Sequence, residues 1–234
     1  MTRVGLVVLL SVVCVLPAWA EDGSTEGKIW QDVRDAVKQL QARYEKMKDM
    51  QADFSQKTKI EGFERPVTSA GKVYIKKPGR LRWDYLDPAS EQIYVNQDDV
   101  KVYVPEHKQV LIGKLTQMAA SQAPLELLQG AAKLDESFNV EPTGKERGPG
   151  GVPLITLIPK AKESASSQNL QKIVVEVFPR SYFIRMVVLH EISGNVAIFE
   201  FSNLKPNNGL GNEIFDFKIP PDAEVVKAPV LNGP

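Results

Sequence analysis

The sequence predicts a protein built mainly from antiparallel β-strands together with some helix, an α+β fold. Segments of alternating apolar and polar residues are separated by turn signals roughly every 8 to 12 residues, the spacing typical of an antiparallel sheet. One long apolar stripe with helical spacing precedes them. The chain has 234 residues, of which 43% are hydrophobic and 25% charged. This is the composition of a globular protein that can bury a sizeable core.

The first twenty residues are predicted to lie outside the fold. Arg3 is the only charged residue before Glu21, and the run from Val4 to Leu16 is apolar. Ala18-Trp19-Ala20 then places small residues at the positions that a signal peptidase reads. We therefore interpret residues 1–20 as a cleaved secretory signal and residues 21–234 as one exported domain.

The cysteine content supports a mature chain without thiol chemistry. The one cysteine, Cys14, lies inside the predicted signal. A lipoprotein signal would place small residues just before its cysteine, whereas Val12 and Val13 stand here. Cys14 is therefore expected to be removed without being acylated, and the mature chain is expected to rest on its core rather than on disulfides.

Two segments carry helical signals. Residues 28–50 are predicted to form an amphipathic helix, because apolar side chains recur at steps of three and four while the other face is polar. A short helix is predicted from Pro124 to Gly130, since Pro suits a first helical position and Gly a stop. The stripe of the long helix comprises Ile29, Val33, Val37, Leu40, Tyr44 and Met47.

Alternation predicts the strands. Residues 71–85 read as a hairpin whose turn is Lys77-Pro78-Gly79 and which carries five cations. Residues 141–153 are rich in Gly and Pro and are predicted to be a loop. Several later strands, such as 195–204, are apolar on both faces, so we expect helices or a ligand to cover both. The other predicted strands are 91–96, 100–104, 108–113, 154–158, 171–178, 182–191 and 213–219.

The sequence shows neither an excess of one charge nor a recognisable catalytic motif. Lysines and arginines equal acidic residues at 29 each, so no overall field favours nucleic acid. His107 and His190 lie in different predicted strands, and neither has a second ligand at metal spacing. The sequence contains no P-loop, no G-x-S-x-G and no H-E-x-x-H. We expect no enzyme activity, no metal and no cofactor.

A series of short motifs, each weak alone, becomes specific through its order along the chain. The motifs are Phe54-Ser55-Gln56, Gly71, Lys77-Pro78, Trp83, Asp87-Pro88, Gln92-Ile93, Val102-Tyr103, Pro124-Leu125-Glu126-Leu127-Leu128, Leu157-Ile158-Pro159-Lys160 and Phe215-Asp216-Phe217-Lys218-Ile219-Pro220-Pro221. In this order they resemble the LolA family, the periplasmic carriers of outer-membrane lipoproteins. The resemblance covers nearly all of the chain after the signal.

The resemblance implies a fold and a function. The fold is an incomplete antiparallel β-barrel, a half-barrel, with a helical lid over an apolar cavity. The function is that of a soluble periplasmic carrier, a monomer without a cofactor, that binds the acyl chains of lipoproteins. Its implied partners are acylated lipoproteins, an ABC-type release complex in the inner membrane and a receptor at the outer membrane.

The resemblance also assigns residues to the cavity. Alternation alone favours plain core for Leu81 and Trp83, whereas the resemblance favours the cavity wall. The residues that the resemblance places at the cavity or on its lid are Phe54, Leu81, Trp83, Leu125 and Leu128.

The basic hairpin departs from the family at one position. The family usually has Arg before the Pro, where it helps to hold the lid closed, and Lys77 stands there in this chain. Lys offers three donors on a point charge instead of five in a planar fork, so the strength of such a latch is expected to differ. The neighbouring Lys76, Arg80 and Arg82 are interpreted as a solvated face, with lipid headgroups or an acidic partner as the alternative.

Other functions remain open on the sequence alone. The nearest is a shuttle on the same fold for another amphiphile, such as a glycolipid. A lipid-anchored receptor of the same pathway is disfavoured by Val13 before Cys14. An envelope module that binds only proteins would lack a lipid cavity, and a hydrolase would need a nucleophile constellation that the sequence does not show.

We predict that the exported protein begins at Glu21 and carries no acyl chain, because the small residues of Ala18-Trp19-Ala20 suit cleavage and those before Cys14 do not suit lipidation. The intact mass of the protein recovered from the periplasm checks this. A mass that retains Cys14 with added acyl chains would contradict it.

Overall fold

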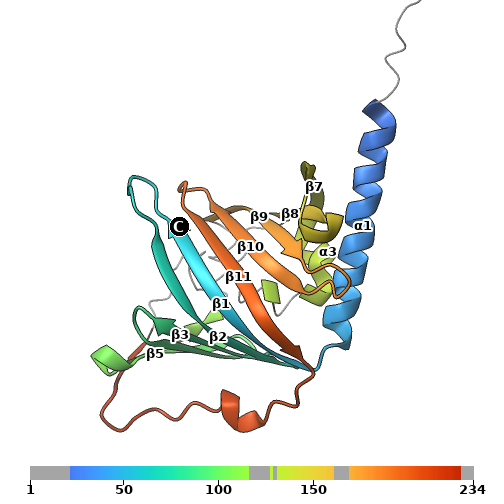
Figure 1. The fold of residues 1–234 in the computed structure, drawn as a ribbon. Coiled ribbons are helices and arrows are strands. Elements are labelled where there is room, and N and C mark those ends of the chain that lie inside the picture. The colour runs from blue at the N-terminus through green and yellow to red at the C-terminus, as the bar shows by residue number, and fades with distance from the viewer. Residues whose placement is uncertain (1–21, 116–126, 129–130, 161–168, 228–234) are drawn as a thin grey trace, which may run out of the picture.

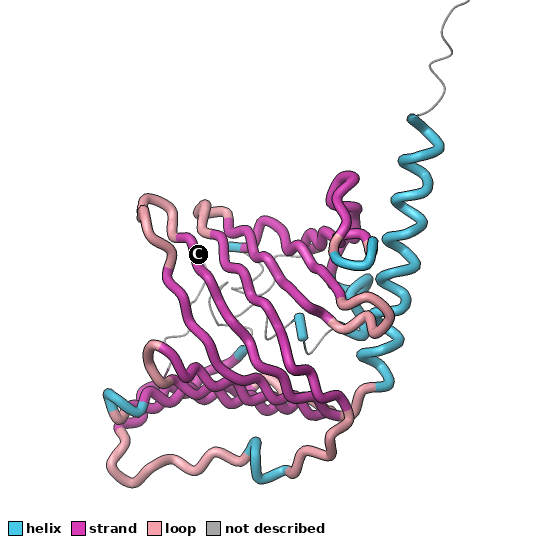
Figure 2. Tube along the Cα trace, viewed as in Figure 1, coloured by secondary structure: helices cyan, strands magenta, loops and turns pink. Residues whose placement is uncertain are grey.

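The architecture is a single curved sheet with helical segments against it. The computed structural model describes residues 22–115, 127–128, 131–160 and 169–227. Twelve strands form one sheet in the order β12-β6-β5-β4-β3-β2-β1-β11-β10-β9-β8-β7. The sheet bends strongly but does not close, and it forms an open half-barrel (Figures 1 and 2). The predicted α+β class and incomplete barrel are confirmed.

The strands are antiparallel neighbours except at one edge, where β12 runs parallel to β6. The strands are β1 Asp49–Lys59, β2 Val67–Lys76, β3 Arg80–Asp87, β4 Glu91–Asn96, β5 Asp99–Val104, β6 Gln109–Lys114, β7 Phe138–Arg147, β8 Pro153–Pro159, β9 Leu170–Val177, β10 Ile184–Glu191, β11 Val196–Pro206 and β12 Glu224–Lys227. The helical segments are α1 Asp22–Lys46, η1 Pro105–His107, η4 Ala131–Lys133, α3 Leu134–Ser137, η5 Pro149–Gly151 and η6 Asn212–Phe215.

The long helix α1 confirms the predicted stripe but ends earlier than expected. Residues 28–50 were predicted to be helical, whereas α1 stops at Lys46 and β1 begins at Asp49. The reason lies in Asp49, which is 6% exposed. Its carboxylate accepts the backbone N–H groups of Asn208 (2.7 Å) and Gly209 (3.1 Å), so the chain is already committed to the sheet there.

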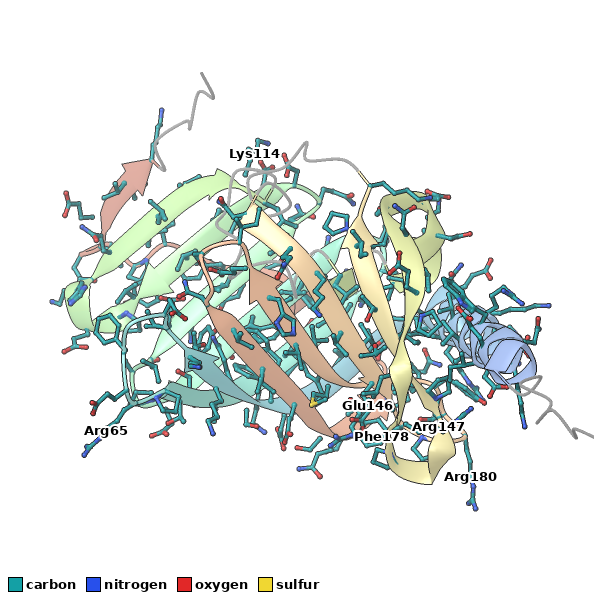
Figure 3. All side chains as sticks on the ribbon, turned by 90° about the horizontal axis from the view of Figure 1, so that it is seen from above. Arg65, Lys114, Glu146, Arg147, Phe178 and Arg180 are labelled. Carbon is teal, nitrogen blue, oxygen red and sulfur yellow. The ribbon has the colours of Figure 1, made fainter. Side chains whose placement is uncertain are left out.

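Helix α1 lies along the β7–β8 edge of the half-barrel (Figure 1). Its apolar stripe contacts η4, β7 and β8 and belongs to the hydrophobic core. On the polar side, Arg147 at the end of β7 pairs with Asp32 of α1 at 2.6 Å, and Figure 3 shows Arg147 beside the helix. Packing and this ion pair fix the helix against the sheet.

The predicted loop 141–153 is wrong in its first half, where β7 continues to Arg147 and pairs with β8. The Gly and Pro residues belong to an irregular edge strand rather than to a loop. Pro142 is tolerated because β7 is the last strand of the sheet, and Gly144 has a positive φ of 57° where the register shifts. Only the turn around η5 fits the loop prediction.

The predicted strand 213–219 is also wrong. These residues form η6 and then an extended stretch outside the sheet. They belong to a segment, residues 207–223, which we call the C-terminal strap because it crosses the outer face of β3 and β4 before β12. The apolar residues that suggested a strand pack against the outer face of the sheet instead. Phe217, for example, stacks on Tyr94 with ring centroids 4.8 Å apart.

The strap explains where the hairpin cations lie, and it corrects the interpretation of Lys76, Arg80 and Arg82 as a solvated face. These side chains are half-buried and contact the strap or the sheet. Lys76 donates to the Leu210 carbonyl, and Arg80 lies 3.9 Å from the Asp216 carboxylate. Arg82 donates to the Ile214 carbonyl (3.3 Å) and to Asp84 (2.9 Å), and its guanidinium lies over the Tyr74 and Tyr94 rings.

The expectation that both sheet faces are covered holds only in part. Over β3 and β4 the strap covers the outer face. On β11 the inner Ala197, Phe199 and Phe201 are buried, whereas Val196 and Ile198 on the outer face are half-buried. Neighbouring side chains in the sheet are enough to shelter these smaller groups partly.

We predict that Arg82→Ala lowers the free energy of unfolding by about 3 kcal/mol, because Asp84, whose side chain is 7% exposed, would lose the cation that compensates its burial. Arg80→Ala is the matched control. Its partner Asp216 has a 66% exposed side chain, so the loss is expected to stay below about 1 kcal/mol. Urea unfolding of both variants measures the difference, and equal losses would contradict the role of Asp84.

Candidate functional site

The inner face of the half-barrel is a continuous apolar surface. Strand register places Phe54 opposite Gly71, Val73 opposite Trp83 and Ile75 opposite Leu81, so these residues share one face. The sheet residues that the sequence assigned to the cavity are buried there. Phe54 is 3% exposed, Leu81 0% and Trp83 1%.

A second set of apolar residues, from residues 127–128 and 131–134, covers this face. Leu127, Leu128, Ala131 and Leu134 are all buried and belong to the same core as the sheet. Leu128 therefore lies against the apolar surface, as does Leu127, which the sequence placed in the motif but not in the cavity. Leu125 lies outside the described residues, as does most of the helix predicted from Pro124 to Gly130, of which only residues 127 and 128 are described, both as helix.

Aromatic rings cluster at the centre of the inner face. The Trp83 ring centroid lies 4.3 Å from that of Phe54, 5.8 Å from Phe199 and 6.1 Å from Phe201. Gly71 makes this approach possible. A Cβ at that position would lie 2.9 Å from a Phe54 ring carbon and 1.8 Å from the Asp84 carbonyl oxygen, both too close. The glycine of the motif thus serves the packing of the aromatic cluster.

Lys77 connects the hairpin to α1. Its ammonium donates a hydrogen bond to the Tyr44 carbonyl, in the last turn of the helix, where a cation is favoured by the helix dipole. The backbone N–H of Lys77 donates to the Lys48 carbonyl at 2.8 Å. Burial lowers the pKa of Lys77, and the nearby charge of Glu45 opposes that shift.

Tyr44 itself extends this connection into the core, and the sequence did not single it out beyond the helical stripe. Its hydroxyl accepts the backbone N–H of Ile184 at 3.4 Å, and its ring meets Phe183 edge-on at 5.5 Å. Burial raises the pKa of Tyr44, and the Ile184 hydrogen bond opposes that rise. The helix end is thus joined to β3's hairpin by Lys77 and to β10 by Tyr44.

The inner face ends in a band of polar side chains, which we call the polar arc: Gln56, Thr58, Tyr85 and Glu91. The Tyr85 hydroxyl donates to Gln56 Oε1 (2.8 Å), and Gln56 Nε2 donates to Thr58 Oγ1 (3.0 Å). Glu91 lies opposite Tyr85 in the β3–β4 register. All four are half-buried, so the arc borders the apolar surface. Sequence reasoning missed it because its members come from three strands that meet only through register.

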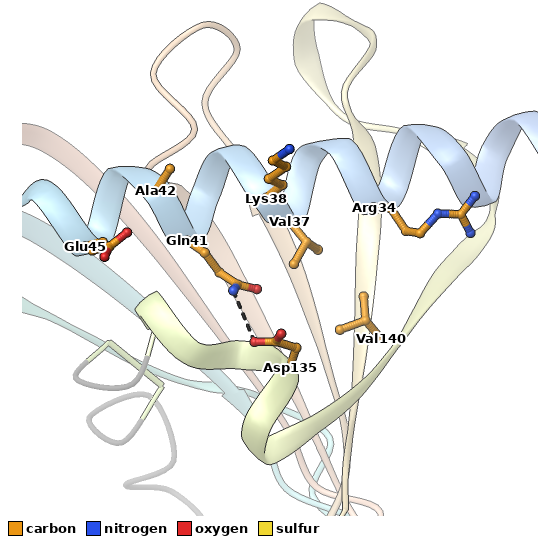
Figure 4. A pocket seen from close by; sticks show the side chains of 8 residues that line it. All are labelled: Arg34, Val37, Lys38, Gln41, Ala42, Glu45, Asp135 and Val140. Carbon is orange, nitrogen blue, oxygen red and sulfur yellow. Dashed lines mark hydrogen bonds between the residues drawn. The ribbon is translucent and has the colours of Figure 1, made fainter.

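A separate groove of about 530 Å³ lies on the other side of the α1 cover, between α1 and the α3–β7 segment (Figure 4). Gln41 Nε2 donates to Asp135 Oδ1 across it at 3.1 Å. Its lining mixes both charges with a few aliphatic groups, so it offers no extended apolar surface. The inner face is the stronger candidate for a site.

The described part of the chain meets neither the requirements of a metal site nor those of a membrane-spanning helix. No group of three or more His, Cys, Asp or Glu side chains is placed there to hold a metal ion. Among the described helices, none combines the length and the apolar character needed to cross a bilayer. The arrangement is suited to holding apolar groups.

Comparisons with known proteins agree with this geometry. Residues 45–218 match the family described as "Outer membrane lipoprotein carrier protein LolA". A protein named outer-membrane lipoprotein carrier protein from Pseudomonas syringae pv. syringae (strain B728a) is 31% identical, covering 82% of this chain and 87% of that protein. One with the same name from Nitrosomonas europaea is 27% identical, covering 97% of this chain and 100% of that protein.

A solved structure of a LolA superfamily protein from Nitrosomonas europaea aligns with 79% of this chain and 97% of its own, with 12% sequence identity and a TM-score of 0.45. The family match extends from the end of α1 into the strap, as far as residue 218, and so spans β1 to β11. The chain belongs to the LolA family of outer-membrane lipoprotein carrier proteins.

Proposed function

We propose that this chain is a non-enzymatic periplasmic carrier that binds the acyl chains of lipoproteins released from the inner membrane and delivers them to a receptor at the outer membrane. The observation that carries the proposal is the inner face of the half-barrel. An apolar, aromatic-rich surface in an open sheet is covered by separate helical segments rather than by closure of the barrel. Membership of the LolA family supports the same cargo.

The size of the task explains why a shielded surface is needed. Three acyl chains hold on the order of 50 methylenes, and at about 0.8 kcal/mol each their exposure to water would cost roughly 40 kcal/mol. The carrier must cover most of this surface throughout its passage. The sequence contains no P-loop, so an ABC-type release complex supplies the energy for loading, and a better binding site at the receptor drives unloading.

The cover must separate from the sheet for cargo to enter. In the closed arrangement Phe54, Leu81 and Trp83 are buried by side chains of the protein itself. Loading therefore replaces these contacts by contacts with acyl chains. Because about as much apolar area is buried before the exchange as after it, the exchange changes the free energy little.

We predict that the mature protein binds an apolar fluorophore saturably and that a triacylated lipopeptide displaces it. Leu81→Glu should weaken both by tenfold or more, since an unpaired carboxylate in an apolar wall costs roughly 2 kcal/mol or more. Fluorescence titration measures the affinities, and circular dichroism checks the fold. Leu86→Glu is the matched control, because Leu86 lies on the same strand but is 58% exposed. Unchanged binding in a folded Leu81→Glu protein would place Leu81 outside the site.

The lipid recovered with the protein separates the proposed cargo from the alternative. Mass spectrometry of the protein purified from the periplasm should show acylated lipoprotein. A copurified glycolipid or other amphiphile would instead identify a shuttle for that compound on the same fold.

We predict that Lys77 acts as a latch between the hairpin and α1, through its hydrogen bond to the Tyr44 carbonyl. A hydrogen bond from a charged donor contributes roughly 1.5–3 kcal/mol, a suitable strength for a cover that opens in each cycle. Lys77→Arg should preserve transfer of a loaded lipoprotein to the receptor. Lys77→Leu should alter its rate or extent, because it removes the donor and adds apolar surface.

Transfer from loaded carrier to the receptor, followed over time, tests the latch. Lys59→Leu serves as control, because it makes the same change at an exposed lysine of β1. Wild-type rate and extent for Lys77→Leu would show that the bond to Tyr44 has no part in the cycle.

A further inference from the structure

One buried polar atom on the inner face has no partner. Among the residues that the structure describes, the indole Nε1 of Trp83 is the buried side-chain nitrogen or oxygen that lacks a hydrogen-bond partner. Trp83 is only 1% exposed. A buried donor without an acceptor costs free energy, and buried tryptophans usually find one. The Tyr85 hydroxyl oxygen lies near this N–H but outside hydrogen-bond geometry, so the donor remains available to an acceptor from a ligand.

The side chains around the indole place Trp83 at the border between the aromatic cluster and the polar arc. Phe54, Phe199 and Phe201 surround the ring with apolar edges and faces. Tyr85, at 6.2 Å between ring centroids, is the member of the polar arc nearest to it in sequence. Burial raises the pKa of Tyr85, the charge of Glu91 raises it further, and a weak contact from the Trp83 indole N–H, outside the geometry of a full hydrogen bond, opposes both. Trp83 therefore stands where the apolar surface meets the polar arc.

The polar arc has capacity for a ligand. The Tyr85 hydroxyl uses its proton on Gln56, which leaves its oxygen lone pairs as acceptors. Gln56 and Thr58 continue the row toward the end of β1. Burial raises the pKa of Glu91. A molecule whose apolar part fills the inner face would meet, at this border, one free N–H donor followed by hydroxyl, amide and carboxyl groups.

We infer that Trp83 and the polar arc form a subsite for the ester or amide carbonyl groups at the head of an acyl chain, with the Trp83 indole N–H donating to a carbonyl oxygen. The inference rests on the proposed function and adds to it the position and orientation of the bound acyl group. The chain beyond the carbonyl lies over the Trp83–Phe54 aromatic cluster. The polar group attached to it lies beside Tyr85 and Gln56.

The chemistry of the donor selects carbonyl oxygen. An indole N–H is a neutral donor without acceptor capacity, so it pairs with carbonyl oxygens and does not neutralise a charge. No lysine or arginine belongs to the polar arc, which makes the arc unsuited to a free carboxylate or a phosphate. Lipoprotein anchors and phospholipids both present acyl carbonyls, and the experiment below compares the two.

The test compares ligands with and without a carbonyl in the mature protein and in Trp83→Phe, which keeps an aromatic ring but removes the N–H. The ligands are a triacylated lipopeptide, a diacyl phosphatidylcholine and N-phenyl-1-naphthylamine, which has no carbonyl. We expect Trp83→Phe to weaken lipopeptide binding about 3- to 10-fold, the loss of one neutral hydrogen bond, and to leave naphthylamine binding within about twofold. Tyr94→Phe on the outer face is the control and should change neither.

A second variant and a spectroscopic readout keep the inference testable if Trp83→Phe folds poorly. Tyr85→Phe removes the arc's hydroxyl and should also weaken the lipopeptide more than the naphthylamine. In the exported chain the tryptophans are Trp30 and Trp83, and Trp30→Phe assigns their indole signals. The Trp83 indole proton should shift downfield when lipopeptide binds and stay in place with the carbonyl-free probe.

The outcomes separate this inference from the proposed function. The carbonyl subsite would be overturned if Trp83→Phe lost affinity equally for all ligands, or for none, and the Trp83 indole proton did not shift. Lipopeptide binding by the wild type would still support a carrier in that case. A wild type that binds the phosphatidylcholine but not the lipopeptide, with a selective loss in Trp83→Phe, would uphold the subsite and overturn the lipoprotein cargo. A wild type that binds no acyl ligand would overturn both.

Discussion

The constraint on which this structure depends is that an open sheet leaves its apolar inner face in need of a separate cover. A closed barrel would bury the same residues permanently. Here β12 and β7 form the two edges of the described sheet, so α1 and the helical residues 127–128 and 131–137 shelter the inner face. The cover is joined to the sheet by apolar packing and by a few polar contacts, such as the ion pair of Arg147 with Asp32.

The outer face has the opposite requirement, and the strap meets it. Asp49 fixes the start of the strap, Arg82 and Phe217 hold its middle, and Lys108 pairs with Asp222 near its end at 2.9 Å. The cations of the hairpin therefore stabilise one face of β2–β5, while Lys77 alone turns toward α1.

The sequence was informative wherever a residue's surroundings follow from its own segment. The stripe from Ile29 to Met47 predicted α1, and alternation predicted most strands. The failures came from distant contacts. Asp49 ended the helix through residues more than 150 positions away, and Phe217 alternates because it stacks on Tyr94, not because it pairs in a ladder. For the site, alternation correctly placed Leu81 and Trp83 on the inner face, where both are buried. Their assignment to a cavity wall rests on the resemblance and stays a prediction, and the polar arc could be found only from the strand register.

The Trp83 N–H, which makes no full hydrogen bond in this structure, would favour the state in which a ligand supplies an acceptor. In this structure the donor makes no full hydrogen bond, a deficit of about 1 kcal/mol that apolar packing alone does not remove. Apolar contacts are nearly interchangeable between the cover and an acyl chain, so they bias the equilibrium little. On the inferred subsite, a carbonyl oxygen relieves the penalty only when cargo is bound. On the proposed function, a loaded carrier would gain a contact that the cover does not supply in this structure.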